Sequence, residues 1–181
     1  RLLTNEELIR REQELHSSVK LVCLDQTGTP IDISARFDSS TPVDVATALT
    51  SMRQHITDRC DARVIVGGKL RGFQGSAPGV IEEALLSVQA HQPLYIAGGF
   101  GGAAAAVAQS LDRDGQAWHP SGFPEGVGDH EGVLRRLLDA YSPPPDDGLT
   151  DGERLQLAAT HRPGDISSLV VTGLGRFATN R

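Results

Sequence analysis

The sequence predicts an α/β protein with a mainly parallel sheet, and the middle of the chain carries the observations that support this. A short apolar run at residues 62–66 (ARVIV) leads directly into a glycine-rich segment at 67–79 and then into a helical pattern. The same order returns at residues 93–97 (PLYIA) and 98–102 (GGFGG), before an alanine-rich helical pattern. Strand, glycine loop and helix twice in succession is typical of parallel strands with helices on both faces of the sheet.

Neither apolar run alternates with polar residues, so we expect both strands to be buried on both faces. Right-handed crossovers make such strands parallel, and they place the two glycine loops at one edge of the sheet. We expect the helices after the loops to cover residues 80–91 and 103–111.

The first forty residues predict a helix followed by a strand. Thr4 can cap a helix that has a glutamate three residues later, the capping-box position, and the charged pattern continues it to about His16. Residues 19–24 (VKLVCL) predict a strand, and residues 26–30 (QTGTP) a turn. Residues 35–40 predict a loop.

A further helix is expected to begin near Thr41, with Pro42 at its first helical position. Its apolar residues recur every three or four positions and form one stripe: Val45, Leu49, Met52 and Ile56.

After residue 112 the regular order of strands, glycine loops and helices ends. Residues 112–128 contain four glycines, two prolines and the only tryptophan, which predicts a long loop of a kind that is often functional. A helix is expected over residues 129–141, and a capping-box pattern at Thr150 predicts another to about His161. Asp165 is expected to cap a last helix through Phe177. The inward side of the helix at 129–141 is predicted to hold Val133, Leu134, Leu137 and Leu138.

Length and charge limit the possible functions. The 181 residues suit one domain, which we divide into residues 1–40, a glycine-loop core at 41–112, and a long loop with closing helices at 113–181. The 17 basic and 23 acidic residues give a net charge of −6, which argues against nucleic-acid and anionic-membrane partners. The absence of an apolar run of about 20 residues and of spaced cysteines predicts a cytoplasmic protein. Because the sequence begins with Arg1, we expect a piece of a longer protein.

The glycine loops predict an anion site. Glycine-rich turns after buried strands let backbone N–H groups approach a phosphate, and the next helix adds the positive end of its dipole. Neither loop matches GxGxxG or GxxxxGK[ST], and the alternative interpretation is that the glycines only permit tight turns and close packing. Lys69 and Arg71 suit phosphate or carboxylate recognition, although loop cations are often merely solvated. Glu82 and Glu83 either stabilise a helix dipole, bind ribose hydroxyls, or stabilise an oxocarbenium ion.

Other chemistry has little support in the sequence. The histidines, including His119 in the long loop and His130, have no metal-ligand spacing, so we expect neither a metal nor a cofactor. No GxSxG element or paired Cys/His arrangement indicates a nucleophilic hydrolase.

Residues 61–111 resemble the SLOG superfamily, which includes the Lonely Guy phosphoribohydrolases, the DNA-processing protein A fold and sensor domains of bacterial conflict systems. The SMR at residues 51–53 resembles the segment before this strand in sensor-type members, and the likeness extends over residues 41–176. The resemblance implies a Rossmann-like three-layer sandwich that binds nucleotides at its glycine-rich edge. With the loop cations and Phe100, the expected ligand-binding residues are Gly67, Gly68, Lys69, Arg71, Gly79, Glu82, Gly98, Gly99, Phe100, Gly101 and Gly102.

The enzymes of that superfamily carry PGGxGTxxE, whereas residues 78–83 of this chain read PGVIEE. The departure favours the sensor branch, for which the resemblance implies NAD-derived or cyclic nucleotide ligands. It also implies a homo-oligomer, and a fused or associated effector such as a TIR domain in anti-phage defence.

Three hypotheses remain open at this point. The first is a ligand sensor without catalysis. The second is a phosphoribohydrolase-like enzyme that cleaves an N-glycosidic bond, in which Glu82 or Glu83 stabilises the ribosyl cation and Arg53 or Arg71 holds a phosphate. The third is a glycine-rich scaffold whose cleft is vestigial and whose surface only mediates assembly, which a cleft blocked by Phe73 and Phe100 would favour.

Overall fold

A computed structural model of the chain describes five stretches of sequence: residues 4–15, 18–32, 44–111, 130–141 and 145–179. The loops expected at residues 35–40 and 112–128, which includes His119, lie outside these stretches, as do Thr41 and Pro42.

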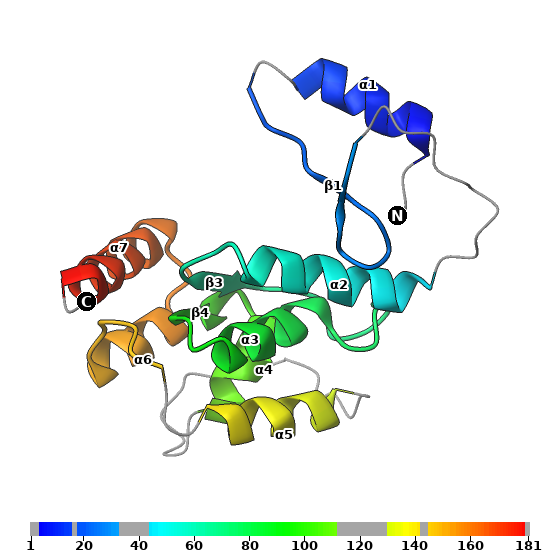
Figure 1. Cartoon of the computed structure of the whole chain (residues 1–181). Helices are drawn as coiled ribbons and strands as arrows, with labels where there is room; N and C mark the ends of the chain where they lie inside the picture. Colours follow the sequence, from blue (N-terminus) through cyan, green and yellow to red (C-terminus); the bar gives the residue numbers. More distant parts are fainter. Residues whose placement is uncertain (1–3, 16–17, 33–43, 112–129, 142–144, 180–181) are drawn as a thin grey trace.

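The N-terminal part is a helix and a small hairpin that project from the rest of the molecule (Figure 1). The capping box at Thr4 is confirmed, because its N–H donates to the Glu7 carboxylate at 2.9 Å and its Oγ1 accepts from the Glu7 N–H at 3.3 Å. The predicted strand at 19–24 is mostly wrong. Only its last two residues pair, while Val19 and Val22 are exposed. The elements are α1 (Asn5–Leu15), β1 (Cys23–Leu24) and β2 (Pro30–Ile31), with the two strands antiparallel.

The turn of this hairpin rests on α2 (Val45–Thr57). Gly28, at φ +83°, brings its backbone so close to α2 that a Cβ there would lie 2.9 Å from the carbonyl oxygen of Ser51. Nδ1 of His55 lies 2.9 Å from the carbonyl oxygen of Gly28. The helix begins at Val45, because the side chain of Asp44 caps it by accepting from the N–H of Ala46 at 3.1 Å.

The central sheet pairs β3 (Arg63–Val66) with β4 (Leu94–Ala97) in parallel, as the sequence predicts. In the register, Arg63 lies opposite Leu94 and Val66 lies opposite Ala97, so both strands end at the same edge of the sheet. β4 is buried or nearly buried along its whole length. The expectation that β3 is buried on both faces is wrong, because Val64 and Val66 are 44% and 47% exposed.

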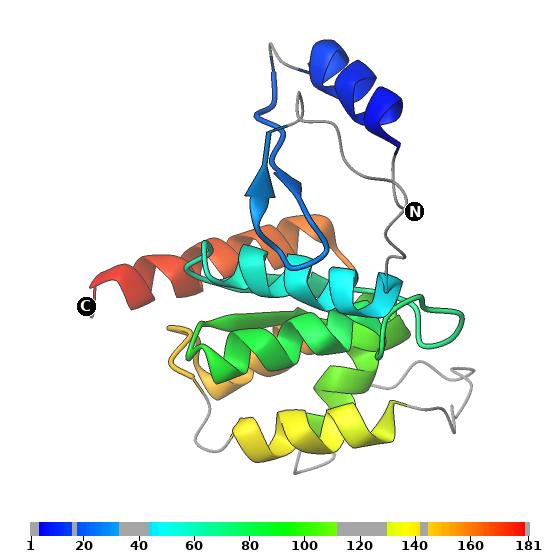
Figure 2. The same ribbon diagram turned by 45° about the vertical axis from the view of Figure 1, so that its right-hand side comes forward.

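Helices lie on both faces of β4 (Figures 1 and 2). One face packs on α3 and α4, with α5 against those two helices, and the other packs on α6 and α7. The helices are α3 (Gly79–Gln89), α4 (Gly102–Leu111), α5 (Glu131–Ala140), α6 (Asp151–Ala159) and α7 (Pro163–Thr179).

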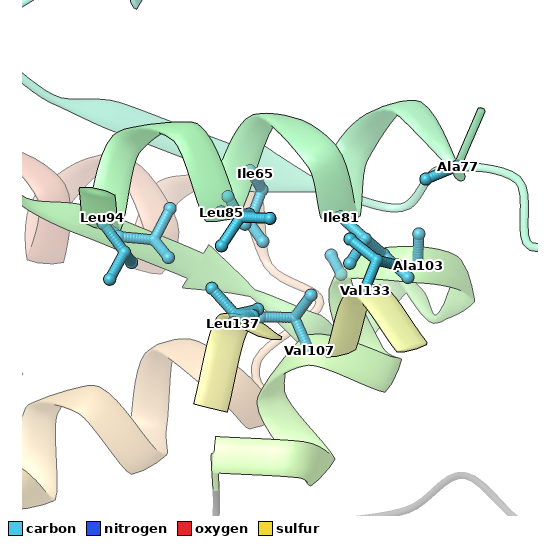
Figure 3. Packing of buried hydrophobic residues seen from close by; sticks show 12 residues of the cluster. Ile65, Ala77, Ile81, Leu85, Leu94, Ala103, Val107, Val133 and Leu137 are labelled. Carbon is cyan, nitrogen blue, oxygen red and sulfur yellow. The ribbon is translucent and has the colours of Figure 1, made fainter. Parts of the chain in front are cut away.

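The larger core lies between the sheet and α3, α4 and α5, where aliphatic side chains from five elements meet (Figure 3). Val133 and Leu137 of α5 are buried in it as predicted, while Leu134 and Leu138 are half-buried. The described residues therefore form a mixed α/β fold in which each of the two sheets has two strands.

The last two helices begin by different means. At Thr150 the predicted capping box is confirmed, and α6 ends at Ala159. α7 begins at Pro163, two residues before the predicted cap Asp165. Proline suits the first position of a helix because its missing N–H has no partner there. Asp165 instead accepts a hydrogen bond from the Thr160 hydroxyl at 3.2 Å.

Candidate functional site

The two glycine loops meet at the carboxyl ends of β3 and β4, as predicted for parallel strands. The N–H groups of Ala103 and Ala104, in the first turn of α4, donate to the carbonyl oxygens of Gly68 and Gly67 at 3.0 and 2.7 Å. Gly102, at φ +66°, lets the second loop approach the Gly68 carbonyl closely. The first-turn amides of α4 are therefore already bound by the first loop.

The second loop is packed against the end of α6. It forms a short 3-10 helix, η1 (Gly98–Phe100). A Cβ on Gly98 would lie 2.6 Å from the carbonyl oxygen of Ala158, and a Cβ on Gly99 would lie 2.6 Å from that of Ala159 and closer still to that of Thr160. Close packing thus explains why residues 98 and 99 are glycines. The sequence had left this open as the alternative to anion binding.

The first loop contains both packed and open glycines. Gly68, at φ +95°, is wedged between α3 and α4, since a Cβ there would lie 2.5 Å from Cγ2 of Val80 and 3.1 Å from Cβ of Ala103. Gly67 and Gly72, at φ +59° and +66°, have nothing within 4 Å of the same position. The open space in this loop lies at those two glycines.

Arg53 of α2 projects to the start of α3, where only glycine leaves room for it. A Cβ on Gly79 would lie 2.5 Å from Nη2 of Arg53, and a Cβ on Gly75 would lie 3.2 Å from Nη1. The Arg53 side chain is 11% exposed, and its Nη1 donates to Oε2 of Glu82 at 2.6 Å. Its Nε is buried without a hydrogen bond, 3.6 Å from Oε1 of Glu83.

Both candidate carboxylates are held by side chains of neighbouring elements. Glu82 is 8% exposed, and its second oxygen accepts a short hydrogen bond from the hydroxyl of Thr50. Glu83 pairs with Arg63 of β3 at 2.8 Å. Arg63 also donates to Ser87 of α3 at 2.7 Å. Each glutamate thus connects α3 to another element of the fold.

Sequence reasoning missed four members of this network. Arg53 was proposed as a phosphate ligand, but its neighbours were not: Thr50, Thr57, Arg63 and Ser87. Thr57 and Arg53 are the buried residues of α2, whereas the predicted apolar stripe is half-buried and ends at Ile56, which is 40% exposed. The spacing of Thr50, Arg53 and Thr57 at three and four residues is the signal that could have identified a polar face.

The start of α3 has unused hydrogen-bond donors. Its N-cap is Pro78, which offers no side-chain acceptor. The Pro78 carbonyl accepts from Ile81 and Glu82, both at 3.0 Å. The N–H groups of Gly79 and Val80 have no acceptor among the residues that the structure describes. A helix start of this kind favours an anion.

The other predicted site residues lie around this position without joining the network. Lys69 and Arg71 are exposed on the first loop, and Phe100 is 51% exposed on the second. Gly101 adopts φ +78° after Phe100. Phe73, which would block a cleft in the scaffold hypothesis, is half-buried.

The described part of the chain contains neither a cluster of metal ligands nor a helix suited to crossing a membrane. His130 is buried with no hydrogen bond at Nδ1, but no group of His, Cys, Asp or Glu there is arranged to hold a metal ion. None of the described helices combines the length and apolar character that a membrane crossing requires.

Fold and site together define an α/β domain with a glycine-lined edge and a buried arginine at a helix N-terminus. The chain belongs to the SLOG cluster2 family, whose model matches residues 1–138. The SLOG assignment made from the sequence is thereby confirmed, and with it a nucleotide-related domain. The matched range includes both glycine loops and Arg53, and it ends within α5. Comparisons with curated proteins and with solved structures found no significant match.

Proposed function

We propose that this domain binds a nucleotide-derived ligand, NAD-derived or cyclic, and holds its phosphate at the start of α3. The observation that carries the proposal is the position of the Arg53 guanidinium against Gly79, beside the unused N–H groups of Gly79 and Val80. Arginine and backbone N–H groups at a helix N-terminus are the groups that proteins use to bind phosphate.

The charges around Arg53 favour an anion. Arg53 and Arg63 are balanced by Glu82 and Glu83, so the four buried or half-buried groups sum to zero. The α3 dipole adds partial positive charge at its N-terminus, and the exposed side chains of Lys69 and Arg71 belong to the loop that leads there. A phosphate bound at the start of α3 would be attracted by this dipole and by the guanidinium of Arg53, which already pairs with Glu82.

The carboxylate geometry supports a binding domain over an enzyme. Stabilising an oxocarbenium ion requires a carboxylate that faces the sugar. The two oxygens of Glu82 are instead taken by Thr50 and Arg53, which makes Glu82 the residue that positions Arg53.

A phosphoribohydrolase-like reaction is the second candidate. The observation that favours it is the proximity of Glu83, which is 32% exposed, to the proposed phosphate position through its contact with Arg53. In this reaction Glu83 or Glu82 would stabilise the ribosyl cation, and Arg53 or Arg71 would hold the phosphate.

The resemblance to the sensor branch leads us to propose further that ligand binding regulates an effector. The effector would be fused or associated, such as a TIR domain, and would act in anti-phage defence in the cytoplasm as part of a homo-oligomer. For the fold we propose a Rossmann-like three-layer arrangement, supported by the parallel β3–β4 pair and the helices on both faces of β4.

Thermal unfolding with a ligand panel tests the proposal. The panel contains NAD, ADP-ribose, cyclic ADP-ribose isomers, cyclic di- and trinucleotides, and AMP. A ligand at one hundred times its Kd stabilises the fold by about 2.7 kcal/mol, a shift of several degrees for a domain of this size. We expect a selective shift that is lost in Arg53→Met and kept in Arg154→Met, a matched arginine of α6.

Chromatography of the recovered ligand separates the two candidates. An intact ligand supports the sensor, and release of a free base supports the enzyme. If no panel member stabilises the wild-type domain, or if Arg53→Met binds as the wild type does, the proposed phosphate site is wrong.

A further inference from the structure

The second glycine loop differs electrostatically from the first. The carbonyl groups of Ala158, Ala159 and Thr160, at the end of α6, face Gly98 and Gly99. The C-terminus of a helix carries partial negative charge, so α6 makes this loop unfavourable for a phosphate. The opposite holds at the start of α3, where the first loop ends.

Some of the N–H groups at the second loop are already used by backbone hydrogen bonds. The α4 helix begins directly after it, but the N–H groups of Ala103 and Ala104 already donate to carbonyl oxygens of the first loop. The Gly101 N–H donates to the Gly98 carbonyl oxygen at 2.8 Å. Together with the carbonyl groups at the end of α6, this favours an uncharged or cationic ligand group at the second loop.

Phe100 gives this loop a surface suited to such a group. It is 51% exposed, while every other aromatic residue in the described ranges is buried or half-buried. Glycines precede and follow it, and Gly101 at φ +78° turns the chain immediately after it. An exposed phenyl ring offers a π-face on which a planar ligand ring can stack.

The two loops are connected through Gly68. The space for a side chain at Gly68 is filled by Val80 of α3 and Ala103 of α4, so the first turns of the two helices meet there. At the neighbouring Gly67, a Cβ would have no other atom within 4 Å. The start of α3 and the start of α4, which follows the second loop, are therefore neighbours at the same edge of the sheet.

We propose that Phe100 stacks on the planar, uncharged or cationic ring of the ligand while the phosphate binds at Arg53. The ligand class is thus a nucleoside phosphate in a fixed orientation, with its phosphate on the first loop and its base on the second. The inference rests on the proposed function and adds the residue that distinguishes a nucleotide from a sugar phosphate.

Calorimetric titration of the full chain with AMP and with ribose 5-phosphate tests the orientation. The two probes share the phosphate and the ribose and differ in the base. We expect Phe100→Leu to weaken AMP binding about tenfold, since stacking of one base on an aromatic side chain is commonly worth that much or more. Ribose 5-phosphate binding is expected to change less than twofold.

Phe100→Trp supplies the second variant, because it keeps a ring and should bind AMP at least as tightly as the wild type. Val171→Ala, at a 69% exposed residue of α7, is the matched control for loss of exposed apolar surface. Equal weakening of both probes in Phe100→Leu, or unchanged AMP binding, overturns the stacking role. Failure of both probes to bind the wild-type chain overturns this inference, whereas the proposed function fails only if no member of the ligand panel stabilises the domain, so the two failures are distinguishable.

Discussion

The β3 half and the β4 half of the central sheet begin from the same sequence pattern and end in different environments. Tyr95 and Ala97 of β4 are fully buried beneath α6 and α7. Val64 and Val66, their partners in the register, are nearly half exposed on β3. Helices cover one strand of the pair on this face, so one glycine loop is closed by packing and the other keeps open space. A glycine loop alone does not indicate which of the two it will be.

The two best-buried arginine networks also differ: all the guanidinium nitrogens of Arg154 donate hydrogen bonds, whereas Nε of Arg53 does not. Arg154 donates to both oxygens of Asp147 at 2.8 Å and to Asp151 at 2.7 Å, and its hydrogen bonds to Asp147 raise the pKa of Arg154 above its usual value. Burial, reinforced by Asp147, raises the pKa of Tyr95 to about 12, so its hydroxyl stays a donor to the Asp147 carbonyl. Arg53 instead retains a buried Nε without a hydrogen bond. The unsatisfied Nε of Arg53, beside a helix N-terminus, is the feature that distinguishes the proposed phosphate site from the Arg154 network.

The largest effect is expected from Gly99→Ala, which places a methyl group against the backbone at the end of α6. Because backbone atoms cannot move aside locally, we expect the free energy of unfolding to fall by about 3 kcal/mol in urea titrations. Gly72→Ala is the control, where φ is +66° and the space is open. It should cost about 1 kcal/mol, and equal losses would contradict a closed second loop.

Arg154→Met removes the ion-pair partner of Asp147, and Asp147 is only 2% exposed. The uncompensated carboxylate should lower the free energy of unfolding by about 2 kcal/mol, less than for a fully buried pair because the Arg154 side chain is 32% exposed. The stabilisation of the domain by AMP should be unchanged. Loss of that stabilisation would show that the Arg154–Asp147 pair also takes part in binding.

Arg53→Met should also lower the free energy of unfolding by about 2 kcal/mol, because it leaves the buried Glu82 carboxylate with only the hydrogen bond from Thr50. Its distinguishing effect is the loss of AMP-induced stabilisation. Adding Glu82→Gln removes the unpaired carboxylate and should restore part of the stability, measured by thermal unfolding. Restored binding in the double variant would argue that Arg53 acts only as the counter-ion of Glu82.

The pH dependence of stability tests the C-terminal helices. The hydrogen bond from Arg176, with those from Thr150, lowers the pKa of Glu153 from 4.5 to about 2. Because the pKa is lower in the folded protein, this contribution is present above about pH 4.5 and is lost as the pH falls toward 2. Glu153→Gln should reduce the change in the urea unfolding midpoint between pH 4.5 and about pH 2. A profile identical to that of the wild type would mean that the pair with Arg176 does not persist in solution.

The smallest effect is expected at β3. Val66→Thr should change the free energy of unfolding by less than about 0.5 kcal/mol, because Val66 is 47% exposed. Ile65→Val, at a residue that is 2% exposed, should cost about 1 kcal/mol in the same urea titration. A larger loss at Val66 than at Ile65 would mean that the outer face of β3 is covered in solution.

Much of the fold could be predicted from the sequence where short-range patterns decide it. The capping boxes at Thr4 and Thr150, the breaks at the glycine loops and the order of strands and helices from residue 62 to 111 all depend on residues close in the chain. The start of α2 was misplaced, because Asp44 caps the helix three residues after the predicted start.

Less of the candidate site could be predicted, because its contacts connect distant residues. Arg53 and Glu82 are 29 positions apart, and Tyr95 and Asp147 are 52 apart. Periodicity in a single sequence carries no information about which of several arginines meets which carboxylate.

The sequence by itself determined the class of fold, the parallel direction of β3 and β4, and the edge at which both glycine loops lie. Those features follow from backbone geometry and local hydrophobic period, which every residue in a segment helps to specify. The tertiary structure decided which face of β3 is exposed, which glycines are used for close packing, and where Arg53 lies. Those features depend on what packs against each element, since burial and charge pairing are set by neighbours in space.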